Sequence, residues 1–362
     1  MSRKILVLGG TGAMGRPLVK ILSEKGDHIY VTSRRSRKDT DRVSYIQGNA
    51  LDDIFLESIL HQMDWDTIID FMVYPTEKFS KRIDTLTSAA RQYIFISSCR
   101  VFADHDKLIT ERSPRLLDVS KDEMYLKTDE YSLRKAREEN ILRNYPNVTI
   151  VRPSVTFNDD RLQLGVYEAS DWIDRVQHDK TIVFSKDIAA HYTTLTHGED
   201  VAYGIAGLIG NPKAIGEDFN IVTNEAFTWQ QVLDIYLETL RKNGFNPKVI
   251  YTEKALNLRI PKWQYQVKYA RLFDRRFNNS KIREAVPELV FIDVRKSLEN
   301  CFEQYLKRNN KSLTLSSVSI LQDREAGDIC KVSDFSSIKQ YLKYLVLRFM
   351  PYSMLLDKIE GR

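Results

Sequence analysis

Short aliphatic runs alternate with amphipathic stretches through the first 153 residues of the chain. The runs carry few charges, and the stretches between them place apolar residues at helical spacing. This alternation is typical of βαβ units whose parallel strands are covered by helices on both faces. It predicts an α/β fold of the Rossmann type, a doubly wound parallel sheet. The expected strands are Lys4–Gly10, His28–Ser33, Val43–Gly48, Asp66–Met72, Tyr93–Ser98 and Val148–Pro153.

The length of the chain indicates more than one domain. At 362 residues it exceeds the size at which a single hydrophobic core usually keeps growing. After Pro153 the alternation loosens, and helices such as Thr228–Asn243 stand alone. We therefore assign residues 1–157 to a Rossmann domain, with its sheet completed by about residues 190–224. A smaller, interleaved substrate-binding domain takes residues 158–189 and 225–305, and residues 306–362 form a C-terminal extension to which the pattern assigns no role.

Within that extension, Ser336–Phe349 has the pattern of a basic amphipathic helix, with Lys339, Lys343 and Arg348 among aliphatic and aromatic residues. The favoured interpretation is a helix packed on its own domain. Contact with another subunit or with a membrane surface is the alternative. The last four residues, Ile359–Arg362, resemble a processing-protease site and are left out of the fold argument, although they are also compatible with a native end.

Composition and charge exclude several classes of protein. The net charge of +5 is a small difference between 54 basic and 49 acidic residues, so charge alone does not indicate nucleic-acid binding. Cys99, Cys301 and Cys330 are an odd, scattered set, which argues against a disulfide framework and against a zinc site. The first apolar run is too short for a signal peptide, and no run is long enough to span a membrane. We expect a cytoplasmic protein without a metal site.

The first expected strand runs into the sequence GGTGAMG, in which Gly9, Gly12 and Gly15 are spaced three apart. A strand that ends in glycines and turns into a helix presents backbone N–H groups and the positive end of the helix dipole to a ligand. With a second strand following, this spacing is typical of a dinucleotide-binding turn. A purely structural glycine turn is the alternative.

The end of the second expected strand indicates which dinucleotide binds. An acidic residue there would bind the ribose hydroxyls of NAD, whereas arginine suits the 2′-phosphate of NADP. The chain has Ser33, Arg34 and Arg35, and no acidic residue before Asp39. This favours NADP(H) over NAD(H), with a solvated basic loop as the alternative.

Candidate catalytic residues lie in two later segments. Tyr131 and Lys135 are four residues apart in a helical pattern that Thr128 or Asp129 can cap, so the ammonium lies near the phenol and favours its phenolate form. Tyr74 and Lys78 have the same spacing but lie where a strand leads into a loop.

The second segment is the end of the fifth expected strand. Ser98 lies there, where ligands of open α/β sheets bind. Its hydroxyl can hydrogen-bond a substrate oxygen, although a plain turn serine is the favoured interpretation of this residue taken alone.

Taken together, the segments GGTGAMG, ISSCRVF, ITERSP, YSLRK and IVRPSVTF resemble the extended short-chain dehydrogenase/reductases, in particular the NAD-dependent epimerase/dehydratase family. The resemblance runs to about Tyr305 and takes in THGEDVA and NNSKIREAVPEL. It implies that Tyr131 is the general acid/base, that Lys135 supports it and holds the nicotinamide ribose, and that Ser98 orients the substrate oxygen. It also implies a homodimer.

The same resemblance implies a set of cofactor contacts at the glycine turn and at the ends of neighbouring strands. The implied residues are Gly9, Gly12, Ala13, Met14, Gly15, Ser33, Arg34, Arg35, Asn49, Ala50, Phe71, Met72, Lys135 and Pro153.

Two departures from the family pattern narrow the function. Cys99 and Arg100 stand where sugar-nucleotide 4,6-dehydratases carry an Asp-Glu pair, which argues against dehydration, and Cys99 is expected to be buried and structural. Thr193 stands where many sugar-nucleotide enzymes have an arginine for the diphosphate. We therefore expect His191 and Arg271 to contact the substrate, with Arg275 or Arg276 as other sources of the charge.

The leading hypothesis is an NAD(P)-dependent enzyme that transfers hydride to or from a hydroxyl or keto group of a sugar, with a nucleotide sugar favoured as substrate. An NADPH-dependent keto-reductase of a non-nucleotide small molecule is one alternative. The other is a non-enzymatic protein of the same fold that binds a dinucleotide or RNA.

Overall fold

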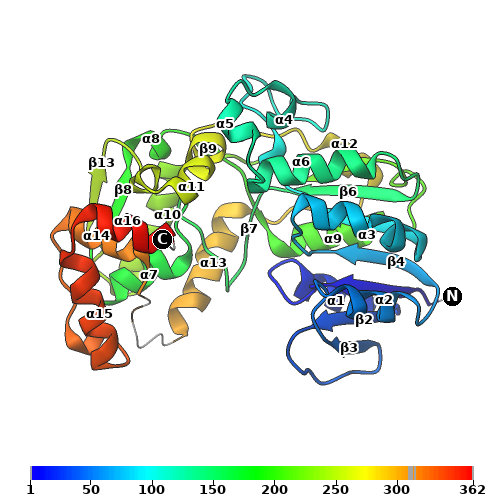
Figure 1. Cartoon of the computed structure of the whole chain (residues 1–362), viewed down its shortest axis with the longest axis horizontal. Coiled ribbons are helices and arrows are strands. Elements are labelled where there is room, and N and C mark those ends of the chain that lie inside the picture. The colour runs from blue at the N-terminus through cyan, green and yellow to red at the C-terminus, as the bar shows by residue number, and fades with distance from the viewer. Residues whose placement is uncertain (1, 309–312, 314, 361–362) are drawn as a thin grey trace. The chain divides into compact units, whose positions relative to one another are not determined.

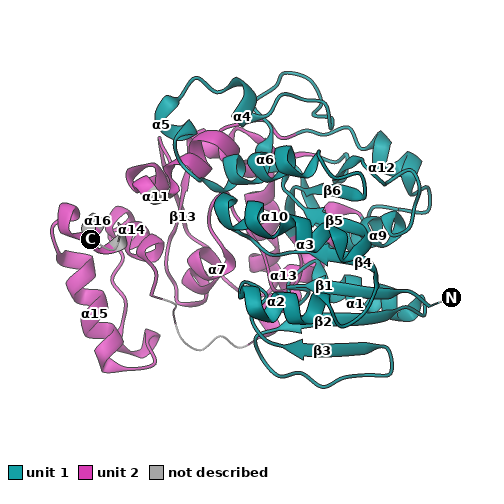
Figure 2. Cartoon of the chain, turned by 45° about the vertical axis from the view of Figure 1, so that its right-hand side comes forward, with its two compact units in different colours: residues 1–156, 194–225, 276–292 teal, residues 157–193, 226–275, 293–362 magenta. Residues whose placement is uncertain are grey.

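The computed structural model describes residues 2–308, 313 and 315–360, so Arg362 and Gly361 of the protease-like sequence lie outside the described residues. The chain divides into two compact units. Unit 1 comprises residues 1–156, 194–225 and 276–292, and unit 2 comprises residues 157–193, 226–275 and 293–362. Figure 1 labels the elements along the chain, and Figure 2 colours the two units.

Unit 1 is built around a seven-stranded sheet in the order β11-β6-β5-β4-β1-β2-β3. Every neighbouring pair runs parallel, as the Rossmann-type prediction requires. The strands are β1 (Lys4–Leu8), β2 (His28–Ser33), β3 (Val43–Gln47), β4 (Trp65–Asp70), β5 (Ala90–Ile96), β6 (Val148–Pro153) and β11 (Asp218–Ile221). The predicted α/β fold and its six strands are confirmed, and β11 extends the sheet beyond β6.

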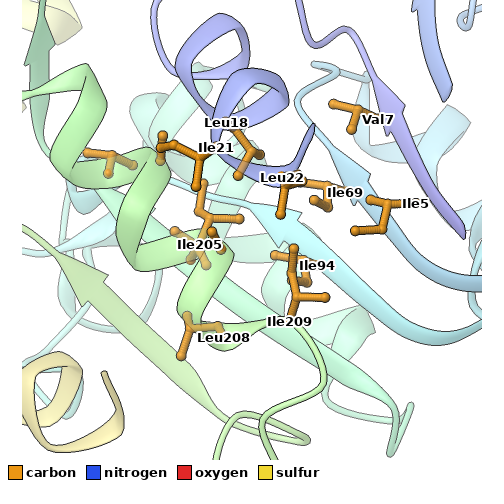
Figure 3. Packing of buried hydrophobic residues seen from close by; sticks show 14 of the residues in the cluster. Ile5, Val7, Leu18, Ile21, Leu22, Ile69, Ile94, Ile205, Leu208 and Ile209 are labelled. Carbon is orange, nitrogen blue, oxygen red and sulfur yellow. The ribbon is translucent and has the colours of Figure 1, made fainter. Parts of the chain in front are cut away.

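Alternate residues of β1 pack on opposite faces of the sheet. Ile5 and Val7 belong to one buried cluster, whereas Leu6 and Leu8 belong to another. Figure 3 shows the first cluster, in which residues of β1, β4 and β5 meet apolar residues of two helices. Since both faces are buried, the strands are continuous aliphatic runs rather than alternating ones.

Two sets of helices cover the sheet. The first cluster takes apolar residues from α1 (Gly15–Glu24), α9 (Gly198–Leu208) and α12 (Ser280–Ala285). The second takes them from α2 (Asp53–Leu60), α3 (Thr76–Ser88) and the end of α6 (Tyr131–Leu142). Unit 1 also contains η1 (Cys99–Val101), α4 (Leu116–Val119), α5 (Glu123–Leu126) and β10 (Leu195–His197), the last paired with β7 (Val155–Phe157) at the unit boundary.

Unit 2 is mainly helical. Its strands pair in twos: β8 (Ile182–Ser185) with β13 (Val249–Thr252) in parallel, and β9 (Tyr192–Thr193) with β12 (Phe227–Thr228) in antiparallel fashion. The rings of Trp172, Tyr236 and Phe302 pack together in its core, with centroids 4.6 to 5.3 Å apart. Its helices are α7 (Ala169–Gln177), α8 (Lys186–Ala189), α10 (Trp229–Lys242), η2 (Leu256–Arg259), α11 (Pro261–Gln266), η3 (Val267–Arg271), α13 (Val294–Lys307), α14 (Ser317–Ala326), η4 (Val332–Asp334), α15 (Ile338–Phe349) and α16 (Tyr352–Glu360).

The bounds of the two units differ from the domain boundaries expected from the sequence. Residues 276–292, expected in the substrate-binding domain, belong to unit 1, because Ile282 and Val286 of the α12 segment join the core cluster of α1 and α9. The C-terminal extension belongs to unit 2. Arg175 of α7 donates a hydrogen bond to Asp323 of α14 at 2.7 Å, and both side chains are fully buried.

Candidate functional site

The glycine turn after β1 is held by close backbone packing. Gly9 has a φ of +75°, in the region that favours glycine. A Cβ on Gly15 would lie 2.5 Å from backbone atoms of Gly10, whereas a Cβ on Gly12 would meet nothing within 4 Å. Gly15 is therefore required for the turn itself, and Gly12 leaves its outer side open for a ligand to approach the backbone.

The start of α1 completes an anion-binding geometry. Met14 lies at the N-cap but makes no side-chain capping hydrogen bond, and α1 has no acidic residue in its first turn. The helix dipole therefore favours a negatively charged group at this end, although in the first turn the N–H of Arg16 donates to the carbonyl of Gly12 at 3.1 Å and Pro17 has no N–H. The residues present fit the diphosphate of a dinucleotide.

Ser33 orders the turn that carries the two arginines. Its hydroxyl donates to the carbonyl of Arg35 at 2.8 Å and accepts from the N–H of Arg35 at 3.2 Å. Arg34 and Arg35 are exposed, whereas Ser33 is buried. The predicted 2′-phosphate site thus consists of two exposed guanidinium groups on an ordered turn.

The other predicted cofactor residues follow the ends of neighbouring strands. Asn49 comes after β3 and is exposed, and its side chain accepts from the N–H of Leu51 at 3.2 Å. Ala50 is buried beside it. Phe71 and Met72 follow β4, and the Met72 sulfur lies against the glycine turn, 2.8 Å from where a Cβ on Gly9 would be. Pro153 ends β6. Since parallel strands end at one edge of the sheet, these residues share the edge that carries the glycine turn.

Ser98 follows β5 at the same edge. It caps η1, where its hydroxyl accepts from the N–H of Arg100 at 3.2 Å, and it is 8 % exposed. Cys99 is 2 % exposed and its thiol lies 3.2 Å from the carbonyl oxygen of Arg152. The expectation of a buried, structural Cys99 is confirmed.

Tyr131 is the first residue of α6 and is partly exposed. The helix is capped by the side chain of Glu130, which accepts from the N–H of Ser132, so the expected cap by Thr128 or Asp129 is wrong. The Arg100 guanidinium lies 5.1 Å from the centre of the Tyr131 ring and forms an ion pair with Glu130 at 2.5 Å.

Arg100 and Ser132 stabilise the charged form of Glu130. Burial would raise the pKa of Glu130, but Arg100 and hydrogen bonds from Ser132 outweigh burial and lower it. An Arg100–Glu130 ion pair therefore lies beside the Tyr131 ring, with the guanidinium nearer its centre. Arg100 was not predicted as part of the site, because in sequence its position indicates only a departure from the dehydratase pattern.

Lys135 lies on the inner face of α6, one turn after Tyr131. Its Nζ is 3.1 Å from Oε2 of Glu138 and 4.2 Å from the centre of the Phe95 ring, and both charged side chains are buried. Burial raises the pKa of Glu138 to about 7, although Lys135 acts in the opposite direction. Glu138 was not predicted, since an acidic residue three places from a lysine usually lies on a solvated helix face.

Glu139 links three further charged or polar side chains beneath Ser98. Its carboxylate accepts from Ser97 at 2.5 Å, from Arg152 at 2.7 and 2.9 Å, and from Arg115 at 3.2 Å. Arg152 also pairs with Asp218 at 2.7 Å. This network joins α6 to β5, β6 and β11, and so fixes the helix that carries Tyr131 against the strand that leads to Ser98.

Tyr74, the rejected alternative to Tyr131, has a structural role. It is fully buried, and its hydroxyl donates to Asp70 at 2.9 Å, as does that of Tyr93 at 2.7 Å. Burial raises the pKa of Tyr74 well above its usual value. Its neighbour Lys78 instead bonds the carbonyl of Leu51.

The two predicted substrate residues belong to unit 2. The His191 ring lies 3.1 Å from a carboxylate oxygen of Asp274. Arg271 is buried, donates to the carbonyl of Gly165 at 2.7 Å and lies 5.5 Å from the Trp229 ring. Within unit 2 both side chains therefore have neighbours that orient them.

Two curated proteins are similar in sequence to part of this chain. It is 25 % identical over 253 residues to subunit 9 of the NADH dehydrogenase 1 alpha subcomplex from Dictyostelium discoideum mitochondria, with 64 % of this chain and 62 % of that protein covered. It is 23 % identical over 235 residues to chloroplast stem-loop binding protein of 41 kDa b from Arabidopsis thaliana, with 60 % and 58 % covered. The match thus spans less than two thirds of either relative.

Among solved structures, MoeE5 in complex with UDP-glucuronic acid and NAD superposes with a TM-score of 0.63 at 18 % identity, over 84 % of this chain and 99 % of that one. This likeness shows a common fold. Residues 5–222 match the model of the NAD dependent epimerase/dehydratase family. With more than half of its residues in that match, the chain belongs to the NAD dependent epimerase/dehydratase family.

Proposed function

We propose that the protein is an NADP(H)-dependent oxidoreductase or epimerase that transfers hydride to or from a hydroxyl or keto group of a nucleotide sugar. The observation that carries the proposal is the glycine turn, in which Gly15 packs on the backbone of Gly10 while Gly12 stays open beside an uncapped helix start. This geometry suits a diphosphate. The bound nicotinamide supplies or accepts the hydride.

The protein side chains manage the proton. In reduction, the hydroxyl of Tyr131 donates a proton to the oxygen of the substrate, and in oxidation it takes that proton back. Ser98 orients the same oxygen by a hydrogen bond. The cations of two ion pairs favour the developing phenolate: Arg100, 5.1 Å from the centre of the Tyr131 ring, and Lys135, one turn along the helix, although Glu130 and Glu138 offset part of their charge.

The preference for NADP(H) rests on Arg34 and Arg35, which the hydrogen bonds of Ser33 place on an ordered turn at the end of β2. Exposed guanidinium groups are suited to bidentate contact with a phosphate. The nucleotide-sugar substrate is supported by the fold shared with MoeE5, which was crystallised with a UDP-sugar and NAD. His191 and Arg271 are the residues that we propose for substrate contact.

A second candidate is a non-enzymatic dinucleotide- or RNA-binding protein. The buried carboxylate of Glu138 favours it, because it offsets the charge of Lys135 that an acid/base tyrosine would use. The two curated relatives, named as an NADH dehydrogenase subunit and as a stem-loop binding protein, point in the same direction. The partly exposed Tyr131 beside Arg100 supports the enzyme, since binding alone does not require this arrangement.

The test begins with mass spectrometry of small molecules released on denaturing the purified protein. The stripped protein is then titrated with NADPH and NADH. Retained NADP indicates an internal redox cycle and thus an epimerase, whereas an empty site that binds NADPH reversibly indicates a reductase. Absence of dinucleotide in both tests contradicts the proposal.

Tyr131→Phe then separates enzyme from binding protein. Hydride transfer to a panel of 4-keto nucleotide sugars should fall by at least about a hundredfold, with NADPH affinity nearly unchanged. Tyr203→Phe is the matched control, because Tyr203 is an exposed residue of α9. Equal turnover in wild type and Tyr131→Phe would exclude the assigned role of Tyr131.

A further inference from the structure

Among the described C-terminal residues of unit 2, α15 packs on its neighbours through one face of the helix. Tyr344 is buried, stacks near Phe335 with ring centroids 5.4 Å apart, and accepts a hydrogen bond from the N–H of Cys330. Arg348 donates to the carbonyls of Asp323 and Asp328 at 3.0 and 3.3 Å. The helix is therefore fixed on α14 and its following loop by its inner face.

The outer face of α15 carries an exposed apolar stripe. The stripe has four residues, Ile338, Leu342, Val346 and Phe349. Their side chains are 56 to 68 % exposed, and their spacing places them on one side of the helix. In the following helix, α16, Tyr352 and Met354 are also exposed. Contiguous exposed apolar surface of this kind marks an interaction site.

The charged residues of α15 itself all have one sign. Lys339 and Lys343 are exposed on the same helix, each one position after a stripe residue. The sequence from Phe335 to Leu356 contains no acidic residue. The surface thus combines apolar side chains with positive charge that nothing on its own segment neutralises.

A cavity of about 430 Å³ adjoins this helix, between α14, α15 and α16. Two lysines, Lys343 and Lys358, line it together with two serines at the start of α14, and its described lining residues include no carboxylate. Its apolar walls come from Leu315, Ile320, Leu347 and Leu355. Ammonium groups above aliphatic walls suit an anionic headgroup with the beginning of an acyl chain.

We propose that α15 docks the protein on a membrane surface rich in anionic lipids. The stripe inserts at the level of the headgroups, and the lysines contact lipid phosphates, as in interfacial amphipathic helices. No helix of the described residues is long and apolar enough to cross a membrane, so the contact is with the surface. A second copy fits less well, because two stripes face to face would bring Lys339 and Lys343 of both copies together.

The test is co-sedimentation of the full-length protein with phosphatidylcholine vesicles and with vesicles that also contain phosphatidylglycerol. We expect binding to the anionic vesicles alone, weakened by salt. Leu342→Glu combined with Phe349→Glu, and Lys339→Glu combined with Lys343→Glu, should each weaken binding by at least about tenfold. Val290→Glu is the control, because Val290 is 81 % exposed and lies outside the stripe.

Three results would overturn the proposal. They are absence of binding to anionic vesicles, equal binding by wild type and both double variants, and self-association in solution that the Leu342→Glu, Phe349→Glu variant abolishes. Circular dichroism confirms that the variants fold. Vesicle binding depends on neither dinucleotide binding nor turnover, so failure of this proposal is distinguishable from failure of the proposed function.

Discussion

Glu138 holds the ammonium of Lys135 in a buried ion pair, with 3.1 Å between Oε2 and Nζ, one helical turn after Tyr131. The Phe95 ring covers the same ammonium at 4.2 Å. Taking both charges out of water is unfavourable, so the pair stands only because each partner compensates the other. The lysine expected to serve a cofactor thus has a protein partner in the structure.

Glu138 should make the stability of the protein depend on pH. Its pKa is raised to about 7 by burial, from an unfolded value of 4.5, so the folded state binds the proton more tightly. The tighter binding of this proton therefore makes its whole contribution to the free energy of unfolding below about pH 4.5. That contribution is lost as the pH rises through about 7. Relative to Glu138→Gln, the free energy of unfolding of the wild type should fall by about 1–3 kcal/mol between these limits.

Urea denaturation at a series of pH values measures this difference. Glu57→Gln is the control, because Glu57 is an exposed residue of α2 and its replacement should leave the pH profile of the wild type unchanged. Parallel profiles for the wild type and Glu138→Gln would show that Glu138 is not the titrating group.

Gly12 and Gly15 should respond differently to the same substitution. Gly15→Ala places a Cβ 2.5 Å from the Gly10 backbone, so we expect the free energy of unfolding to fall by about 3 kcal/mol. Gly12→Ala meets nothing within 4 Å, so the protein should keep its stability while dinucleotide affinity falls, since the new methyl group occupies the approach of the diphosphate. Thermal unfolding with and without NADPH measures both effects. A destabilised Gly12→Ala protein would contradict this separation.

Arg34 and Arg35 should determine the choice of dinucleotide. Replacing both with alanine removes charge-assisted hydrogen bonds to the 2′-phosphate, so the Kd for NADPH should rise about tenfold to a hundredfold while that for NADH stays near its wild-type value. Isothermal titration calorimetry provides both constants. Lys38→Ala, in the same exposed loop, serves as the control. An equal loss of affinity for NADPH and NADH would contradict the assignment of Arg34 and Arg35 to the 2′-phosphate.

The sheet, the glycine turn and the position of Tyr131 could be predicted because each depends on local sequence. Aliphatic runs define buried parallel strands, and the spacing of Gly9, Gly12 and Gly15 defines the turn. The roles of Glu138 and Glu139 could not be predicted, because a charged residue in a helix usually faces solvent, and only tertiary packing places these two among arginine and lysine partners.

The difference between the expected domain boundaries and the two compact units has a similar cause. Residues 276–292 follow a segment of unit 2 in sequence, and their membership of unit 1 depends on contacts of α12 with α9, which lie far apart in the chain. The cap of α6 depends on the orientation of one carboxylate, that of Glu130. Sequence favoured the two preceding residues, Thr128 and Asp129, because these residue types are commoner helix caps.

The buried network around Glu139 should contribute to the stability of unit 1. Glu139 is fully buried and accepts hydrogen bonds from Arg152, Arg115 and Ser97. Glu139→Gln keeps the shape of the side chain but removes its charge, which leaves Arg152 with Asp218 alone as a carboxylate partner at 2.7 Å. Since breaking a buried ion pair exposes the full desolvation penalty of the remaining charge, the free energy of unfolding should fall by about 3 kcal/mol.

Lys20→Gln is the matched control for this last prediction. Lys20 pairs with Glu24 on the surface of α1 at 3.9 Å, and both side chains are largely exposed, so its replacement should leave the urea midpoint unchanged. Equal midpoints for the wild type and Glu139→Gln would mean that the remaining partners hold Arg152 and Arg115 without the carboxylate. A lowered midpoint with an altered position of Ser98, measured as a loss of turnover at unchanged NADPH affinity, would show that the network positions the strand end as well as stabilising it.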